Sequence, residues 1–167
     1  MKQLALILDN IRSAHNVGAI IRNAAAFGVA DIFCCGITPY PYIGSSDIRL
    51  PHIAHTATEK IAKTSLGGEQ ICTIAHFEST IQAIESLPQG STLYALEIEP
   101  NAHDIASFEP EFPCALILGN EVEGISQTLT AQCDAVVSIP TTEAKRSLNV
   151  ASASAVALFH FASCSSS

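Results

Sequence analysis

Short apolar runs of strand length alternate along the whole chain with segments of helical periodicity. The runs are rich in apolar and β-branched residues and are bounded by polar or glycine-containing turns, which is typical of strands. The expected strands are residues 4–8, 31–35, 71–77, 92–97, 114–118 and 135–139. The expected helices are residues 17–27, 58–66, 80–87, 126–132 and 149–162. This alternation predicts an α/β fold, with a parallel sheet flanked by helices.

The length and composition predict one domain. A chain of 167 residues that is 48% hydrophobic can bury a substantial core, and it shows no internal repeat or linker. We therefore expect a single domain over residues 1–164 and a polar tail over 165–167. No apolar run reaches the ~18 residues that a membrane span needs, and no secretion signal opens the chain. The expectation is a cytoplasmic protein with no membrane partner.

Two stretches lack a regular pattern. Residues 36–57 contain three prolines together with Tyr40 and Tyr42. A loop of this length is usually functional or mobile, and its aromatic rings could stack on a base, although packing on the surface explains them more simply. Residues 100–113 are acidic and bounded by prolines, so we expect a solvated connection there.

The six cysteines give no metal or disulfide pattern. Two of them are adjacent, and no C-x-x-C spacing occurs. Most lie in or beside apolar segments and are expected to be small buried hydrophobic residues, namely Cys34, Cys72, Cys114 and Cys133. A zinc site and a disulfide framework therefore have no support.

Three segments share a strand–loop–helix build and carry polar residues where the helix begins. In the first, strand 4–8 leads into a helix with Asn16 at its mouth and Arg22 further along. Helical side chains lean toward the helix N-terminus, so the Arg22 guanidinium can extend back toward that mouth. When this segment is considered alone, Asn16 is better explained as a helix cap, and Arg22 is better explained as a solvated surface cation.

In the second segment, strand 114–118 runs into Gly119, and Glu121 lies directly beyond the carboxyl end of the strand. Open α/β sheets bind ligands at this edge, and a glycine lets a ligand approach the backbone closely. A glycine-flanked turn is weak evidence when it stands alone.

The third segment, residues 139–150, places Ser147 and Asn149 at the start of the last helix. A helix start offers unpaired N–H groups and the positive end of the helix dipole, so it suits a polar or anionic ligand. Alone, Ser147 is better explained as a helix cap.

Together, and in this order, the three segments resemble motifs 1, 2 and 3 of the SpoU/TrmH family of RNA methyltransferases, within the SPOUT superfamily. Asn16 and Arg22 match the N-x-G-x-x-x-R pattern of motif 1. Motif 2 is matched by Leu118-Gly119-Asn120-Glu121 with Gly124, and motif 3 by Ile139-Pro140 followed by Ser147-Leu148-Asn149-Val150. The resemblance covers nearly the whole chain.

The resemblance implies methyl transfer from S-adenosylmethionine to a ribose 2′-hydroxyl of RNA, a homodimer, no metal, and a C-terminal trefoil knot. The implied catalytic residues are Arg22, Asn16, Glu121, Ser147 and Asn149. The implied cofactor-binding residues are Leu118, Gly119, Asn120, Gly124, Ile139, Thr141 and Leu148. In the family, the motif 1 arginine is assigned the role of activating the ribose hydroxyl, and the resemblance gives this role to Arg22. Because arginine is almost always protonated, a phosphate-binding role for Arg22 is physically simpler than a general-base role.

The charge distribution is uneven. The net charge is −8, which is unusual for a protein that binds RNA through phosphate contacts. Residues 64–144 contain no Lys or Arg and hold twelve of the sixteen acids. Arg12, Lys145 and Arg146 lie next to motifs 1 and 3 and are the expected RNA contacts. They would form a small basic face if those motifs meet, and a random scatter of few charges explains them about equally well.

Other functions fit the sequence less well. A Rossmann-type enzyme needs a glycine-rich turn after its first strand, and this chain has Asp9-Asn10-Ile11-Arg12 there. A knotted RNA-binding scaffold without catalysis stays open because of the acidic charge. Among RNAs, tRNA is favoured weakly over rRNA, because the sequence shows neither an additional N-terminal domain nor a basic tail.

Overall fold

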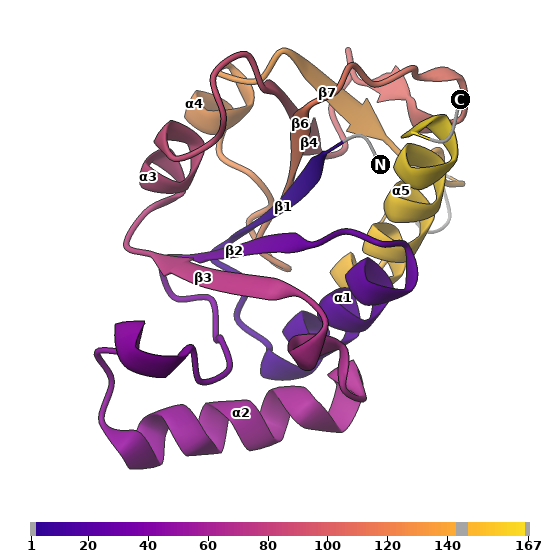
Figure 1. Cartoon of the computed structure of the whole chain (residues 1–167). Helices are drawn as coiled ribbons and strands as arrows, with labels where there is room; N and C mark the ends of the chain where they lie inside the picture. Colours follow the sequence, from indigo (N-terminus) through magenta and orange to yellow (C-terminus); the bar gives the residue numbers. More distant parts are fainter. Residues whose placement is uncertain (1–2, 143–146, 166–167) are drawn as a thin grey trace.

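The computed structural model describes residues 3–142 and 147–165. Their strands form one seven-stranded sheet in the order β3-β2-β1-β6-β4-β7-β5, and all the pairings are parallel (Figure 1). The strands are β1 (Leu4–Asp9), β2 (Asp31–Cys35), β3 (Thr73–Phe77), β4 (Thr92–Leu96), β5 (His103–Asp104), β6 (Cys114–Leu118) and β7 (Ala135–Ser138). The predicted α/β fold with a parallel sheet is confirmed.

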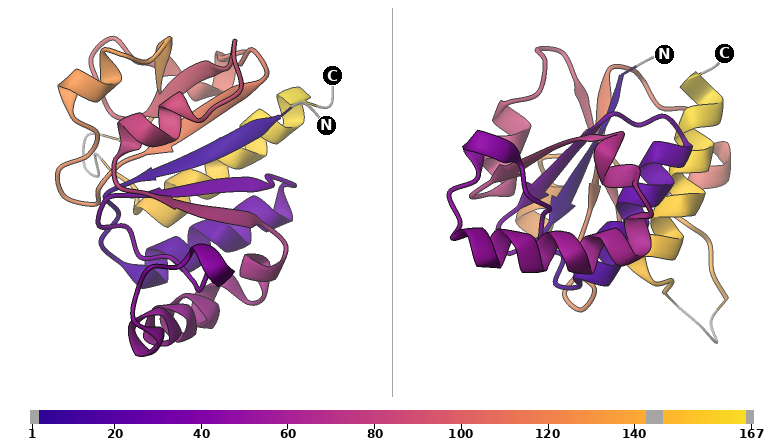
Figure 2. Two further views of the ribbon diagram at one scale, coloured as in Figure 1. Left: turned by 60° about the vertical axis from the view of Figure 1, so that its left-hand side comes forward. Right: turned by 60° about the horizontal axis from the view of Figure 1, so that its bottom comes forward.

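Helices cover both faces of this sheet. They are α1 (Ala14–Ala26), α2 (Pro51–Ser65), α3 (Thr80–Glu85), α4 (Gln127–Thr130) and α5 (Val150–Ser165), with single 3₁₀ turns η1 (Gly44–Ser46), η2 (Gly68–Gln70) and η3 (Ile105–Ser107). Helices α1 and α5 lie on one face, α3 and α4 lie on the other, and α2 packs on the outside of α1 (Figures 1 and 2).

The central strands show why the apolar runs are continuous. Along β1, Leu4, Leu6 and Leu8 contribute to the core under α1 and α5, whereas Ala5 and Ile7 contribute to the core under α3 and α4. A strand buried on both faces needs apolar residues at every position, unlike a strand with one face in water. The run that predicts a strand therefore also predicts its central place in the sheet.

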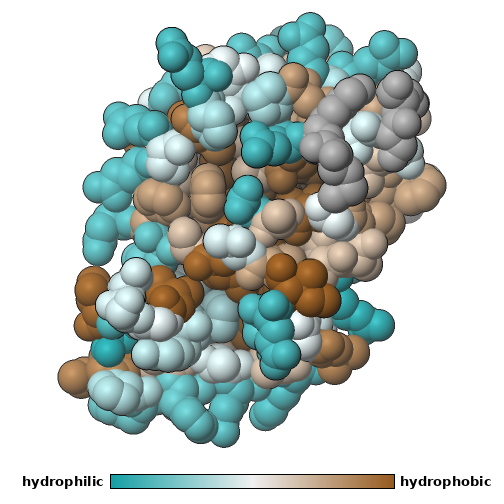
Figure 3. Space-filling view, in the orientation of Figure 1, coloured by the Kyte–Doolittle hydropathy of each residue, from teal (hydrophilic) through white to brown (hydrophobic). Residues whose placement is uncertain are grey.

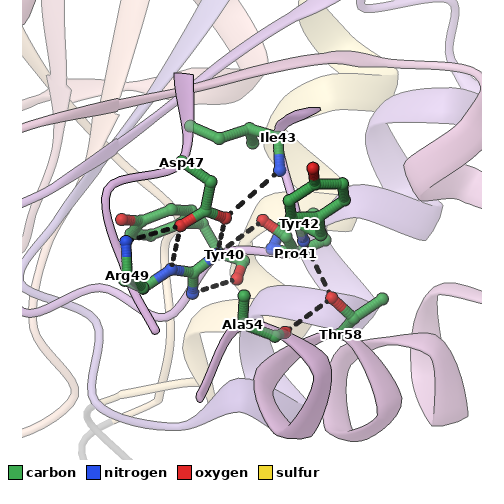
Figure 4. A network of polar contacts seen from close by, with 8 residues as sticks. All are labelled: Tyr40, Pro41, Tyr42, Ile43, Asp47, Arg49, Ala54 and Thr58. Atoms are coloured by element: carbon green, nitrogen blue, oxygen red, sulfur yellow. Dashed lines mark hydrogen bonds and ion pairs between the residues drawn. The ribbon is translucent and has the colours of Figure 1, made fainter. Parts of the chain in front are cut away.

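The expectation of a long irregular loop over residues 36–57 is wrong for its last third. Helix α2 begins at Pro51, which is acceptable because a helix leaves the first N–H groups unpaired. The rest of the loop is held by Arg49, whose guanidinium contacts Asp47 and the carbonyls of Tyr40 and Pro41 (Figure 4). This pairing lowers the pKa of Asp47 to about 2.

The two tyrosines of this loop differ in exposure. Tyr40 is only 6% exposed, with the Arg49 guanidinium carbon 3.5 Å from its ring centre and His76 stacked at 4.3 Å. Its ring is thus unavailable to a base, as the packing explanation predicts. Tyr42 is 63% exposed, and its backbone N–H is bound by Thr58 at 2.8 Å.

The expectation of a solvated connection over residues 100–113 is also wrong. This segment contains β5 and η3, and Ile105 within it is buried. Phe108 packs edge-on against Tyr94 at 5.1 Å and also contacts Phe161. Although the segment is acidic on average, Ile105 and Phe108 pack into the core. The composition of a segment does not reveal such contacts, because packing depends on single side chains.

Smaller differences concern element ends. Strand β3 begins at Thr73 rather than at 71, and Ile139 lies just beyond β7. Helix α5 continues to Ser165, so the first residue of the expected tail is helical. Cys34, Cys72 and Cys114 are buried as expected, Cys133 is part-buried, and all six cysteines are free. The loop that leads into α5 includes residues outside the described ranges, so the trefoil knot stays a prediction.

Over the described ranges, no helix combines the length and apolar character that crossing a lipid bilayer requires.

The crossing of α1 and α2 depends on Gly18. A Cβ at this position would lie 2.1 Å from Thr64 Oγ1 and 2.4 Å from the Ile61 carbonyl oxygen. We expect Gly18→Ala to lower the free energy of unfolding by about 1–3 kcal/mol, because overpacking forces the helices apart. Gly68→Ala is the matched control, since its Cβ would come no closer than 3.1 Å to any neighbour. Urea unfolding of both variants tests this, and equal losses would contradict the explanation.

Candidate active site

A cavity of about 450 Å³ opens beyond the carboxyl ends of β4, β6 and β7, beside the start of α5. All seven residues predicted to bind the cofactor line it: Leu118, Gly119, Asn120, Gly124, Ile139, Thr141 and Leu148. Glu121, Ser147 and Asn149 line it as well. Motifs 2 and 3 therefore meet at one site, because parallel strands end at the same edge of the sheet.

A chain of side-chain hydrogen bonds links all three motif segments. Asn16, in α1, donates from Nδ2 to Glu121 Oε1 at 2.9 Å. Asn149, before α5, donates from Nδ2 to Asn16 Oδ1 at 3.3 Å. Each of these two bonds joins residues that are more than a hundred positions apart in sequence. The bonds bring the mouth of α1 to the rim of the cavity.

Glu121 has further partners at the start of α1. Its two carboxylate oxygens accept the backbone N–H groups of Arg12 at 2.9 Å and of Ser13 at 3.1 Å. Burial raises the pKa of Glu121, but the bonds from the Arg12 backbone, the Asn16 side chain and the Ser13 backbone lower it. Since the side chain is exposed to solvent, the bonds dominate and the pKa lies below its usual range. The carboxylate also favourably faces the positive end of the α1 dipole.

The residue that caps α5 is Asn149. Its Oδ1 accepts the backbone N–H of Ala151 at 2.9 Å, and helix α5 starts at Val150. The cap explanation therefore applies to Asn149, whereas Ser147 lies two residues earlier, exposed at the cavity rim. A capping oxygen fixes the side chain of Asn149, which leaves its Nδ2 directed at Asn16.

The turn after β6 is built by Gly119 and Asn120. A Cβ at Gly119 would lie 2.5 Å from Ile125, so this glycine serves the turn itself rather than the approach of a ligand. Asn120 Nδ2 donates to the Asn10 carbonyl at 2.8 Å, and its Oδ1 accepts the N–H of Val122 at 2.9 Å. Contacts of Asn120 with a ligand would thus come mainly from its backbone.

Glu97 is a cavity residue that the motifs do not include. It follows β4 directly and lines the cavity, and its Oε2 accepts the N–H of Ile125 at 2.8 Å. Gly124 has a φ of +67°, and a Cβ there would lie 2.3 Å from Glu97 Oε2. Glu97 therefore holds the 119–125 turn in place. The signal that could identify it is the one used for Glu121, a carboxylate just beyond a strand end.

The expected basic residues lie around the cavity rather than in it. Arg12 is exposed in the loop before α1, and Arg22 is exposed on α1. Neither lines the cavity, and neither forms an ion pair with another described residue. Lys145 and Arg146 lie outside the described residues. Arg22 is therefore free to meet an anionic ligand.

Within the described ranges, no three His, Cys, Asp or Glu side chains come together as metal ligands. The cavity is lined instead by the side-chain amides of Asn120 and Asn149 and by the carboxylates of Glu97 and Glu121. Such an arrangement can orient a polar substrate and hold a cationic or polar cofactor.

The profile of the "SpoU rRNA Methylase family" matches residues 3–159. The chain belongs to the SpoU methylase family. A relative in Xanthomonas axonopodis pv. citri, named 23S rRNA (guanosine-2'-O-)-methyltransferase RlmB, is 31% identical over 95% of this chain and 57% of its own length. The chain spans roughly three fifths of the length of the curated relatives it matches.

Solved structures of SpoU-type proteins share the fold. The Streptomyces viridochromogenes SpoU methyltransferase AviRb, in complex with the cofactor AdoMet, superposes with a TM-score of 0.81. It is 24% identical, and the match covers 99% of this chain and 59% of AviRb. A structure described as giving structural insights into the 2-OH methylation of C/U34 on tRNA superposes with a TM-score of 0.78. It is 22% identical, and the match covers 99% of this chain and 97% of the other.

Proposed function

We propose that this chain transfers a methyl group from S-adenosylmethionine to a ribose 2′-hydroxyl of RNA, and that the RNA is tRNA. The observation that carries the proposal is the hydrogen-bonded chain from Glu121 through Asn16 to Asn149. It joins the acceptor-side residues of motif 1 to the cofactor-side residues of motifs 2 and 3 at one cavity rim.

The cavity fits the cofactor. Its volume of about 450 Å³ lies within the range of small-molecule sites, and its lining mixes apolar side chains with backbone polar groups. Leu118, Ile139 and Leu148 supply the apolar walls. The turn at Gly119–Gly124 can supply mainly backbone carbonyl acceptors, because the N–H groups of Val122, Glu123 and Gly124 are bonded to Asn120 within the turn. S-adenosylmethionine, when bound, supplies an electrophilic methyl group. The exposed Glu121 carboxylate keeps the rim negative, which suits a sulfonium cation.

The acceptor ribose would lie between the cavity rim and α1. Arg22 binds the phosphate next to the acceptor, which lowers the pKa of the hydroxyl and positions it. Asn16, fixed on one side by Glu121 and on the other by Asn149, orients the ribose. Ser147 holds the rim from the α5 side. Phosphate or water would accept the hydroxyl proton. The bound cofactor would supply the methyl group to the ribose oxygen, and its S–CH3 bond would break to release S-adenosylhomocysteine.

For the RNA, the two comparisons point to different classes. We favour tRNA because the fold is similar, over 99% of this chain, to that of the protein described for 2-OH methylation of C/U34 on tRNA. The relative named for 23S rRNA makes rRNA the second candidate. A scaffold without catalysis is the third, and it needs no cofactor.

We further propose a homodimer that uses α5. Val156 and Phe159 lie one turn apart on this helix and are 43% and 63% exposed, and Phe159 contacts Phe27 edge-on at 6.1 Å. A contiguous exposed apolar face often marks an interface. The face adjoins α1, so a second copy would lie beside Arg22.

We expect Phe159→Glu to convert a dimer into a monomer, because the charge would be buried against the partner. Light scattering at micromolar concentration measures this. Ile81→Glu makes a similar change at a residue that is 41% exposed on α3, across the sheet from α5, and it should leave the molar mass unchanged. A wild-type monomer with full activity would contradict the dimer.

Calorimetric titration with S-adenosylmethionine, followed by transfer of labelled methyl groups to bulk tRNA and to rRNA, tests the proposed function. We expect saturable cofactor binding and incorporation into tRNA. Incorporation into rRNA alone would correct the substrate. The absence of cofactor binding would reject the enzyme in favour of the scaffold.

A further inference from the structure

The cations of the described residues are few, and nearly all of them are free. Five Lys and Arg fall in the described ranges: Arg12, Arg22, Arg49, Lys60 and Lys63. Arg49 is used inside the molecule by Asp47 and two carbonyls, and its side chain is 16% exposed. The other four are exposed. These four are therefore the described cations that a phosphate can reach.

All four lie on α1, on the loop before it, or on α2. Thr64 Oγ1 donates to the His15 carbonyl at 2.9 Å, which ties the last turn of α2 to the first turn of α1. A Cβ at Gly68, just after α2, would lie 3.3 Å from the Arg22 Cα. Figure 2 shows α1 and α2 side by side in both views. The end of α2 thus lies along residues 15–22 of α1.

We name this surface the α1–α2 strip and define it by Arg12, His15, Arg22, Lys60 and Lys63. Lys60 lies one helical turn before Thr64 and Lys63 directly precedes it, so both exposed lysines are next to the end of α2 that contacts α1. In the orientation of Figure 1, hydrophilic side chains line the lower edge, where α2 lies (Figure 3).

The rest of the molecule carries the opposite charge. Residues 66–142 contain eleven Asp and Glu and no Lys or Arg. The strip has two neighbouring acids. Glu59, on α2, has its carboxylate 3.7 Å from His55, and Glu69, just after α2, accepts a hydrogen bond from Ser65. An RNA chain that lay across the acidic body would be repelled by it. Among the described residues, the α1–α2 strip is therefore the surface along which an RNA backbone can extend from the site without crossing the acidic part of the molecule.

We propose that the α1–α2 strip binds the phosphate backbone of the RNA segment next to the acceptor nucleotide, so that the RNA runs from the Asn16–Glu121 rim along α2. The inference rests on the proposed function and adds a direction and an extent to it. Arg12 and Arg22 hold phosphates beside the acceptor, whereas Lys60 and Lys63 bind phosphates further along the chain. An acidic protein thereby binds RNA through a small, oriented set of cations.

The double variant Lys60→Gln/Lys63→Gln tests the strip. Binding of fluorescently labelled bulk tRNA is measured by anisotropy over a range of salt concentrations. We expect Kd to rise about tenfold at low salt, and the slope of log K against log salt to fall in magnitude by about 1.4–1.8. S-adenosylmethionine affinity, measured by calorimetry, should stay at the wild-type value because both lysines lie away from the cavity.

Two matched variants separate a local effect from one of net charge. Glu59→Gln and Glu85→Gln remove the same charge, one beside the strip and the other on α3 across the sheet. We expect Glu59→Gln to tighten tRNA binding about twofold and Glu85→Gln to leave it unchanged. Equal tightening by both would overturn the strip, since only net charge would then matter.

Wild-type Kd and salt slope in the double lysine variant would also overturn it. This failure is distinguishable from failure of the proposed function. If the wild-type protein transfers methyl groups to RNA while the lysine variant binds tRNA normally, only the strip is wrong. If the wild-type protein binds no RNA and transfers no methyl group, both are wrong.

Discussion

Replacement of Arg22 by alanine should reduce turnover by about 10²–10³-fold while the affinity for S-adenosylmethionine stays nearly unchanged. Arg22 does not line the cofactor cavity, and it is exposed on α1 without an ion-pair partner among the described residues. Its loss should therefore remove a contact with the acceptor RNA and leave the cavity intact. Single-turnover methylation of the cognate RNA, with folding checked by circular dichroism, measures the effect.

Arg22→Lys is the control that separates charge from shape. An ammonium ion keeps the charge but cannot reproduce the planar, two-pronged contact of a guanidinium with a phosphate, so it should rescue little. A solvated surface arginine would respond differently, because either substitution would be almost silent in turnover and stability. Near-wild-type rates in Arg22→Ala would refute the role assigned to this residue without touching the fold.

The second large effect is expected at Glu121. This carboxylate accepts bonds from the Arg12 and Ser13 backbones and from the Asn16 side chain, so it fixes the start of α1 against the cavity rim. Glu121→Gln keeps the size but places an N–H₂ group where an acceptor is needed. We expect turnover to fall by about 10²-fold, because misplaced positioning groups cost this much in rate. The rate of methyl transfer at saturating cofactor measures it.

Glu123→Gln is the matched control for Glu121→Gln. It lies two residues further along the same exposed turn, and its carboxylate accepts no hydrogen bond from the described part of the chain. It should leave turnover unchanged. Equal losses in the two variants would show that the charge of the turn matters, rather than the bonds to α1.

The pH dependence of Glu121 follows from the same bonds. Because they lower the pKa of the folded carboxylate, its contribution to stability is fully present above the ordinary value of 4.5. It is lost as the pH falls through the lower, folded value. The difference in urea midpoint between wild type and Glu121→Gln should therefore be constant near neutral pH and shrink below about pH 4.5.

The parts of the fold that were predictable are those with strong local patterns. Strands buried on both faces need unbroken apolar runs, so β1 and β6 were evident from sequence. The start of helix α2 was predicted seven residues too late, since Pro51 suggests a break although it is compatible with a first helical turn. Strand β5 is two residues long and lies in an acidic segment, so no period reveals it.

The site was predictable where a residue follows a strand or opens a helix. The lining residues at Leu118–Gly124 and Ile139–Leu148 were found in this way, and the resemblance to a family then connected them. The bonds between Asn16, Glu121 and Asn149 were not predictable, because they depend on how distant segments pack. Glu97 was not predicted because the expected strand 92–97 includes it, whereas β4 ends at Leu96 and leaves its carboxylate free to bind Ile125.

The central claim is methyl transfer to a ribose hydroxyl of RNA, and analysis of the product nucleosides tests it most directly. The protein is incubated with S-adenosylmethionine and bulk tRNA, and the RNA is digested to nucleosides and examined by mass spectrometry, with rRNA treated in parallel. We expect a 2′-O-methylated nucleoside to appear in tRNA with the wild-type protein and to be nearly absent with Arg22→Ala. Methylation confined to a base, or no ribose methylation in either RNA, would contradict the claim.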